Sequence, residues 1–354
     1  LKLYILKNNS CFIQLPSLKS EVNEIDGVCQ IKIDVPFPVK FVSLYLFKVG
    51  DKNVLIDAGL NNKSWIKIFL DKLSELNKYI SDIDICIITH PHIDHIGLTN
   101  VLKESNPDVE ILMHDITNKV LEWETDKSNL EEIKQEAIDI SFQMKRYGLS
   151  EEQRMRIVQF FTFWPKLRHY QKPDRVLHDG DKVLEELEII WTPGHSFGHI
   201  CIYDKEKKYL FSGDHILSRI TPHIGNFIVP KYLAEQYKDY DFNNVLEQYL
   251  HSLDRINDLN IQVIFPGHQD VIFNPHERIE QIKNHHKNRL ENISSLITNT
   301  PMTPLKISKI HFGEDLDEIN SFMALSEVLG HLLYLEAHEE VKTIEKNGKI
   351  LYYS

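Results

Sequence analysis

A dense group of polar side chains directly after an apolar run constrains this chain more than any other feature. The stretch ITHPHIDHIGL, residues 88–98, places His90, His92, Asp94 and His95 within six positions. The apolar run DICIIT that leads into it is typical of a buried strand. Four such side chains are not expected in an apolar core, because burying a polar group without a hydrogen-bond partner is energetically costly. The spacing therefore predicts a metal-binding cluster at the end of a strand.

Three further strand ends carry residues of the same kind. His195 lies in TPGHSFGH, Asp214 in FSGDH and His268 in FPGHQD, and each follows a glycine that allows the backbone to turn tightly. A histidine at one such position is usually an ordinary core residue, but four elements in this order make coincidence improbable. We expect seven residues to converge on two divalent ions, most plausibly zinc: His90, His92, Asp94, His95, His195, Asp214 and His268. The lack of thiolate ligands favours a catalytic site with open positions over a closed structural one.

Composition indicates which binding partners and which cellular compartment to expect. The 354 residues suit one large domain with an appendage, and a net charge of -12 argues against a general affinity for nucleic acid or anionic membranes. A local basic groove stays open as an alternative. Four scattered cysteines without a CxxC pair indicate free thiols in a reducing compartment, and neither a signal peptide nor a membrane span is expected. These features predict a cytoplasmic protein.

The order of apolar patterns predicts sheets covered by helices. A strand-rich first quarter leads to alternating helices and strands, which a long, charged, helical insertion at residues 116–172 interrupts. The insertion is either a lid over the site or scaffold packing, and we expect most of its aromatic residues Phe160, Phe161, Phe163 and Trp164 to pack in the core, with one or two in a lid. From residue 277 helices precede a hairpin on Asn347 and Gly348, which predicts a winged helix. The expected division is a catalytic domain at residues 1–276 and a winged-helix domain at residues 277–354.

The motif HxHxDH, followed by a single His, an Asp and a final His, resembles the metallo-β-lactamase superfamily. The resemblance covers about residues 30–270 and implies an α/β fold, a four-layer αββα sandwich. It also implies that His90, His92 and His195 hold one zinc ion, that Asp94, His95 and His268 hold the other, and that Asp214 bridges the two. Asp57, in the segment IDAG, matches a further motif and would hold a ligand imidazole, although a turn residue that ends a strand is the simpler alternative. His199 and His215 lie beside ligands but off the motif, so they are expected to be supporting or structural.

The C-terminal part resembles the winged-helix appendage of superfamily members related to β-lactamase-like protein 2. The match includes FSGDHILSRITPHIG at residues 211–225. Residues 301–354 contain 5 Lys, no Arg and 9 Asp plus Glu, which is a poor phosphate-binding surface. A structural role, packing on the catalytic domain and walling the cleft, ranks above binding of duplex DNA.

These features predict a zinc-dependent hydrolase. A hydroxide shared by two zinc ions is a nucleophile at neutral pH, and Asp94 is the expected catalytic residue because it can bind metal and orient that hydroxide. The expected partner is a small-molecule ester, thioester or lactone. One alternative is a single-strand-specific ribonuclease or phosphodiesterase, since one fold serves many substrates. The other is a non-catalytic winged-helix regulator.

Overall fold

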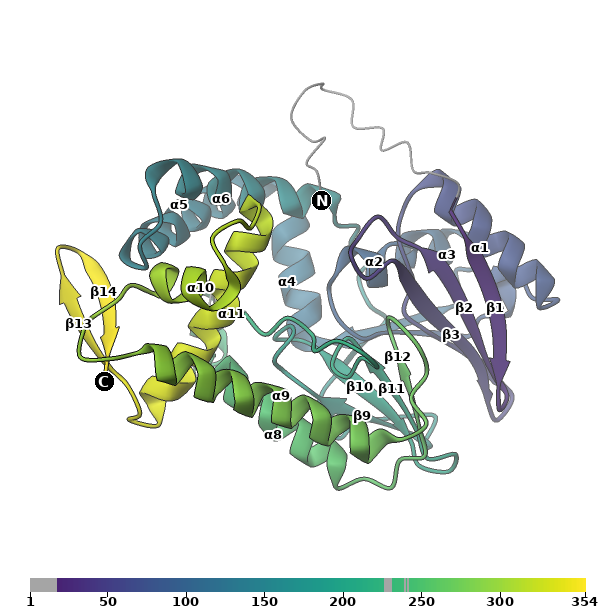
Figure 1. Cartoon of the computed structure of the whole chain (residues 1–354). Helices are drawn as coiled ribbons and strands as arrows, with labels where there is room; N and C mark the ends of the chain where they lie inside the picture. Colours follow the sequence, from purple (N-terminus) through teal and green to yellow (C-terminus); the bar gives the residue numbers. More distant parts are fainter. Residues whose placement is uncertain (1–17, 226–230, 239, 241) are drawn as a thin grey trace.

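Two β-sheets form the centre of the molecule, and helices cover their outer faces (Figure 1). The computed structural model describes residues 18–225, 231–238, 240 and 242–354. Cys11 and the whole N-terminal stretch in which no signal peptide is expected, residues 1–17, lie outside the described residues. Cys29, Cys86 and Cys201 carry free thiols.

The first sheet has seven strands in chain order: β1 (Ser20–Ile25), β2 (Val28–Asp34), β3 (Phe41–Val49), β4 (Lys52–Ile56), β5 (Ile85–Ile88), β6 (Glu110–His114) and β7 (Arg175–Leu177). The pairs from β1 to β4 are antiparallel, and those from β4 to β7 are parallel. The parallel strands end at one edge, so the segments after β4 and β5 emerge side by side. This edge carries Asp57 and the HxHxDH motif.

The second sheet has five strands in the order β12 (Val263–Pro266), β11 (Tyr209–Gly213), β10 (Ile200–Asp204), β9 (Leu187–Trp191) and β8 (Lys182–Val183). β11 and β12 are parallel, whereas the other pairs are antiparallel. The two sheets pack face to face through a shared apolar core in which Phe47 of β3 stacks on Phe211 of β11 at 4.5 Å.

Helices on both outer faces complete four layers, so the expected αββα sandwich is confirmed (Figure 1). On the first sheet, α1 (Lys63–Glu75) begins at the cap Asn62 and buries Trp65, Phe69 and Leu73, which recur at the helical period. This face also carries η1 (Ile80–Asp82), α2 (Ile93–Ile96) and α3 (Thr99–Ser105). On the second sheet lie α8 (Val245–Asn257) and α9 (Pro275–Leu296), and α7 (Lys231–Gln236) precedes them.

The insertion is helical, as expected, but of the four aromatic residues only Phe161 packs against a core cluster, and it is half-buried there. It consists of α4 (Asp115–Thr125), η2 (Lys127–Asn129), α5 (Leu130–Arg146), α6 (Glu151–Phe163) and η3 (Trp164–Leu167). Phe160 is 42% exposed and stacks on Trp164, which is half-buried. The prediction of mostly core packing was therefore wrong. The reason is that α6 turns Ile157 inward and leaves the aromatic residues along its flank and end.

The C-terminal elements follow the expected order of helices and a hairpin. They are α10 (Pro304–Phe312), α11 (Glu318–Ala337), β13 (Lys342–Lys346) and β14 (Lys349–Tyr353). The hairpin turns at Asn347 and Gly348, which both have positive φ. The winged-helix assignment itself remains a prediction, and so does the domain boundary.

These C-terminal helices share cores with the rest of the chain. α9 places Ile279 and Ile282 in the core beneath the second sheet and Ile293 in the C-terminal core. α11 packs Leu325 and Leu329 against the insertion helices α5 and α6. Within the described residues, no helix is both long and apolar enough to cross a membrane.

Candidate metal centre

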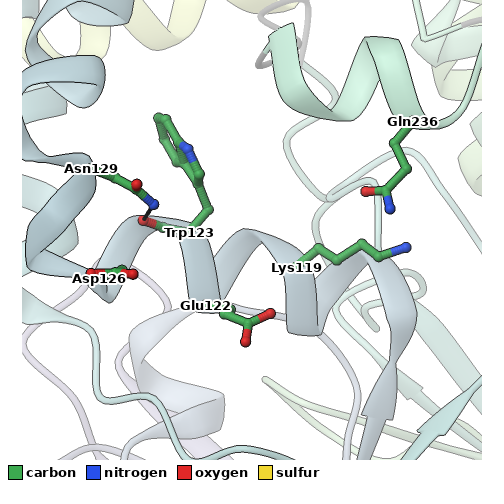
Figure 2. A pocket seen from close by; sticks show the side chains of 6 residues that line it. All are labelled: Lys119, Glu122, Trp123, Asp126, Asn129 and Gln236. Atoms are coloured by element: carbon green, nitrogen blue, oxygen red, sulfur yellow. Dashed lines mark hydrogen bonds between the residues drawn. The ribbon is translucent and has the colours of Figure 1, made fainter.

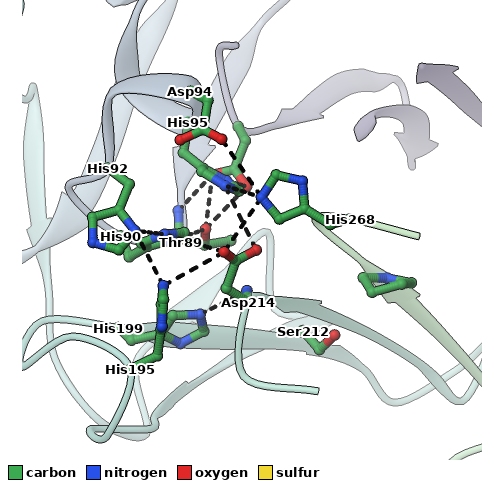
Figure 3. Close-up of polar contacts among 12 residues, drawn as sticks. Thr89, His90, His92, Asp94, His95, His195, His199, Ser212, Asp214 and His268 are labelled. Carbon is green, nitrogen blue, oxygen red and sulfur yellow. Dashed lines mark hydrogen bonds and ion pairs between the residues drawn. The ribbon is translucent and has the colours of Figure 1, made fainter. Parts of the chain in front are cut away.

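The structure brings all seven predicted residues together at the ends of four strands (Figure 3). His90 and His92 follow β5, and α2 supplies Asp94 and His95. His195 follows β9, Asp214 follows β11 and His268 follows β12. The seven side chains fall into two adjacent sets, each with its ligand-type atoms within 4.8 Å of one another.

The first set joins His90, His92, His195 and Asp214. His92 Nδ1 lies 3.0 Å from His90 Nε2 and 3.1 Å from His195 Nε2, so three ring nitrogens face one point. Asp214 Oδ2 lies 3.5 Å from His195 Nε2. This arrangement has the shape of a site for one ion.

The second set joins Asp94, His95 and His268. His268 Nε2 lies 3.4 Å from His95 Nε2 and 3.5 Å from Asp94 Oδ2. Asp214 also reaches this set, because its Oδ2 is 3.3 Å from His268 Nε2 and its Oδ1 is 3.6 Å from His95 Nε2. Asp214 therefore lies between the two sets, where a bridging ligand was expected.

A hydrogen bond on the far side of the ring orients four of the five imidazoles. In each of them the nitrogen Nδ1 contacts an oxygen, which leaves Nε2 facing the centre. The contacts are His90 with Thr89 Oγ1 at 3.0 Å, His95 with Asp57 Oδ2 at 2.7 Å, His195 with the carbonyl of His223 at 3.1 Å, and His268 with the carbonyl of Phe41 at 2.6 Å.

Asp57 holds His95 as the sequence suggested, and it does more than end a strand. Its carboxylate also accepts hydrogen bonds from the backbone N–H of Thr89 at 2.8 Å and from the Thr89 hydroxyl at 2.9 Å. Asp57 has a φ of 63°, a conformation that an aspartate tolerates better than most residues. Asp57 and Thr89 thus tie β4 and β5 together directly beneath the site.

The glycines before the ligands serve two different needs. Gly213 has a φ of 47°, which fits the expected tight turn. Gly267 is needed for space, since a Cβ there would lie 2.8 Å from both Asp214 Oδ1 and His95 Cε1. A glycine before His268 therefore allows β12 to approach the two sets closely.

Burial keeps the first set of imidazoles uncharged. Burial and neighbouring histidines lower the pKa of His90 and of His92 well below the ordinary value. Burial also lowers the pKa of His195, against the opposing charge of Asp214. Neutral imidazoles are the form that binds metal ions, so this set is in its binding form at neutral pH.

In the second set, nearby carboxylates outweigh burial and favour the protonated imidazoles. Burial opposes protonation of His95, but the charges of Asp57, Asp214 and Asp94 outweigh it and raise its pKa to about 10. The same competition raises the pKa of His268. Burial would raise the pKa of Asp214, but His268 and His95 hold it well below its ordinary value. A cation is therefore favoured here, and a divalent ion would displace the protons.

The residues fit a pair of divalent ions. Asp214 Oδ1 is buried and has no hydrogen-bond partner among the described residues, although such an atom is costly unless something binds it. Imidazole nitrogens and carboxylate oxygens without thiolate suit zinc.

Sequence reasoning missed several supporting residues. Thr89 directly precedes the motif and could have been suspected from its position. His223 lies in the stretch 211–225 that matched relatives, but nothing in the sequence indicated its role, because the contact with His195 is made by a backbone carbonyl. His199 supports the site as expected, since its Nε2 accepts the backbone N–H of Asp214 at 3.1 Å.

Residues 38–268 match the family model described as the metallo-beta-lactamase superfamily. The chain belongs to the metallo-beta-lactamase superfamily. The match spans the two sheets and ends at His268, the last of the seven predicted residues.

Relatives within this superfamily extend the match to the C-terminal helices. A protein of Bacillus subtilis (strain 168) named probable metallo-hydrolase YqjP is 27% identical over 93% of this chain and 98% of its own length. The beta-lactamase-like protein 2 homolog of Caenorhabditis elegans is 27% identical over 74% of this chain and 67% of its own. The crystal structure of a metallo-beta-lactamase family protein from Thermus thermophilus is 26% identical, with a TM-score of 0.70, and covers 93% of this chain and 99% of its own.

Two more distant superfamily relatives have names that state an activity. Acyl-coenzyme A thioesterase MBLAC2 of Bos taurus is 24% identical over 52% of this chain and 64% of its own length. Atrochrysone carboxyl ACP thioesterase of Aspergillus fumigatus is 22% identical over 67% of this chain and 53% of its own.

Proposed function

We propose that this metallo-hydrolase superfamily member uses two zinc ions to hydrolyse small thioesters and related esters or lactones. One observation carries the proposal: two sets of ligand-type atoms meet at Asp214, whose carboxylate reaches both. His90, His92 and His195 would hold one ion, Asp94, His95 and His268 would hold the other, and Asp214 would bridge them.

The chemistry divides between the ions and Asp94. Bound zinc ions supply a water of lowered pKa and polarise the carbonyl oxygen of the substrate. Asp94 is mostly buried, with its Oδ2 3.5 Å from His268 Nε2, and we assign its carboxylate to orient the attacking water and accept its proton. In thioester hydrolysis a water oxygen replaces the sulfur at the carbonyl carbon, and the carboxylate of Asp94 would pass the proton of that water to the departing thiolate.

Two considerations support a small acyl substrate. Two superfamily relatives are named as thioesterases, one for acyl-coenzyme A and one for an acyl carrier protein substrate. The net charge of -12 and the lack of Arg in residues 301–354 disfavour a duplex DNA partner.

The buried thiols of Cys86 and Cys201 agree with a reducing, cytoplasmic compartment.

We propose that the insertion takes part in substrate recognition. Its first helix contacts the loop of His195, because the Thr117 hydroxyl donates to the carbonyl of Gly198 at 2.8 Å. Burial and His195 lower the pKa of His92, and the charge of Arg168 from the insertion adds to this effect. Arg168 pairs with Glu124 of α4, and both side chains are largely buried within the insertion.

Two pockets in the described part of the chain are lined largely by insertion residues. One of about 310 Å³ lies between α4 and α7 (Figure 2) and is lined by Lys119, Glu122, Trp123, Asp126, Asn129 and Gln236. The other, of about 520 Å³, lies between α5 and α6 and includes the apolar residues Leu130, Ile133, Ile138 and Val158. None of the seven candidate ligands lines either pocket, so neither hollow would hold the reacting carbonyl of a substrate.

The test combines metal analysis with a substrate panel. Purified protein should contain about two zinc ions per chain and should cleave acyl-coenzyme A thioesters faster than β-lactams or bis-nitrophenyl phosphate. Asp94→Asn should abolish turnover, whereas Asp108→Asn, an exposed aspartate before β6, should not change it. Cleavage of single-stranded RNA or the phosphodiester alone would favour the ribonuclease alternative. Protein that takes up no transition metal would favour the regulator.

A further inference from the structure

The segment after Asp214 returns to the centre at His223. The Nδ1–H of His195 donates to the carbonyl oxygen of His223 at 3.1 Å. This bond leaves Nε2 of His195 as the nitrogen that faces His92 and Asp214. The position of one backbone carbonyl therefore decides how this imidazole is oriented.

Helix α11 holds the side chain of His223 from two sides. Nδ1 of His223 lies 3.2 Å from Glu327 Oε2, and Nε2 lies 2.7 Å from Ser326 Oγ. Glu327 Oε2 also accepts the backbone N–H of Ile224 at 3.2 Å. Two consecutive residues of α11 thus fix both the ring of His223 and the peptide that follows its carbonyl.

The packing around these bonds leaves no room for displacement. A Cβ on Gly225 would lie 2.4 Å from both His223 Nε2 and Ser326 Oγ. A Cβ on Gly330, one turn along α11, would lie 3.0 Å from the carbonyl oxygen of Ile224. The segment therefore rests on α11 with no space for a side chain at position 225, and a Cβ at position 330 would require the carbonyl of Ile224 to shift.

Electrostatic interactions of Glu327 also stabilise the contact between α11 and the His223 segment. Glu327 is buried and forms an ion pair with Arg289 of α9. Burial would raise the pKa of Glu327, but His223, His331 and Arg289 outweigh it and hold the pKa below its ordinary value. The carboxylate therefore stays ionised and keeps its bonds to α9 and to the His223 segment.

His286, Glu327 and His331 also form a group with metal-ligand geometry, but Glu327 and His331 are already engaged by contacts within the protein. Glu327 Oε1 contacts Arg289, and Oε2 contacts His223 and Ile224. His331 Nδ1 contacts the carbonyl of Glu327 at 2.7 Å, and its Nε2 contacts His286 Nδ1 at 3.2 Å. An arginine against the carboxylate would repel a cation, so this group serves as an anchor.

We propose that the C-terminal helices complete the metal centre: Ser326 and Glu327 of α11, with Arg289 of α9, position His223 so that its carbonyl orients His195. The inference rests on the metal centre of the proposed function. It makes the C-terminal helices part of the site and these side chains positioning residues; Ser326 and Glu327 each contact a residue 103 positions earlier in the chain.

The experiment compares four variants of the full chain by zinc titration against a competing chelator. His223→Ala keeps the carbonyl but removes the ring that anchors it. His223→Asn retains a donor near the position of Nδ1 and should recover part of the loss. Ser326→Ala removes one hydroxyl and suits a helix interior. His251→Ala, at an exposed position of α8, is the matched control.

His223→Ala should weaken the binding of one of the two ions about 10- to 100-fold, the range for removing a group that orients a ligand. Ser326→Ala should weaken the same ion by a smaller factor, and His251→Ala should match wild type. The visible spectrum of the cobalt-substituted protein should change in His223→Ala, which reports altered ligand geometry independently of turnover.

Wild-type zinc affinities and an unchanged cobalt spectrum in both His223→Ala and Ser326→Ala would overturn the inference. If metal-free His223→Ala does not fold, Ser326→Ala alone decides between these results. A wild-type protein that takes up no metal would refute the proposed function itself, and the two failures are therefore distinguishable.

Discussion

Replacement of Asp57 by asparagine tests how strongly a residue outside the ligand set controls the metal centre. The side chains have the same shape, and asparagine also tolerates the φ of 63° at this position. Asp57 accepts bonds from His95 Nδ1 at 2.7 Å and from the N–H and hydroxyl of Thr89. An amide presents one oxygen and one NH₂ group, so it cannot accept on both sides.

The expected loss of metal affinity follows from the hydrogen bond that the asparagine side chain cannot make. If the NH₂ group faces His95, Nδ1 must give up its proton, and Nε2 then carries the hydrogen that would block a metal ion. If it faces Thr89, two N–H groups collide. Loss of such an orienting group costs 10- to 100-fold in metal affinity, or about 1.4–2.7 kcal/mol. We expect this loss for the ion held by His95.

The same substitution should affect the metal-free protein in a pH-dependent manner. Burial opposes the charge of His95, but Asp57 and two other carboxylates raise its pKa to about 10, above about 6.5 for an unfolded histidine. A raised pKa stabilises the fold below pH 6.5, and this stabilisation disappears as the pH rises through 10. Asp57→Asn should therefore lose most stability at or below pH 6.5, and its difference from wild type should shrink toward pH 10.

Two measurements check this reasoning. Zinc titration against a chelator gives the affinity, and urea unfolding of metal-free protein gives the free energy of unfolding at each pH. Asp26→Asn is the matched control, because Asp26 is exposed and also has a positive φ, of 51°. Zinc affinity within twofold of wild type in Asp57→Asn would refute the role assigned to the carboxylate.

Three further outcomes are expected. Asp214→Ala should lose both ions and all turnover, because the carboxylate reaches both sets, whereas His92→Ala should retain one ion; metal analysis that finds both ions in Asp214→Ala would contradict the bridge. Trp164→Ala should change KM or acyl preference at constant zinc content, since Trp164 is half-buried near the end of an insertion that contacts the loop of His195. Unchanged kinetics across the acyl-coenzyme A panel would show that Trp164 does not line the substrate pocket. Burial lowers the pKa of His286 to about 3 and of His331 to about 4, so the unfolded chain takes up protons at a higher pH than the folded chain does. The free energy of unfolding of the metal-free protein should therefore fall by up to about 3 kcal/mol for each histidine between pH 6.5 and 4. Urea unfolding that is independent of pH in this range would contradict their burial as neutral groups.

The sequence by itself determined which residues meet at the candidate metal centre. Polar ligand-type residues at the ends of apolar strands cannot be buried without partners, so the convergence of His90, Asp214 and His268 could be predicted although they follow strands of two different sheets. Local turn chemistry likewise predicted the hairpin at Asn347 and Gly348, which depends only on neighbouring residues.

Tertiary structure alone decided what holds and surrounds that centre. The side chains of His223 and Glu327 form an ion pair although they lie more than 100 positions apart, and the carbonyl of His223 contacts His195, so no local pattern marks either contact. Gly267 is required by the close approach of Asp214 and not by its own backbone angles. The aromatic residues of the insertion failed as core predictions because exposure depends on which face of α6 meets a neighbour. Ligand identity follows from residue chemistry that is local to each strand end, whereas orientation and exposure follow from packing between elements that are distant in the chain.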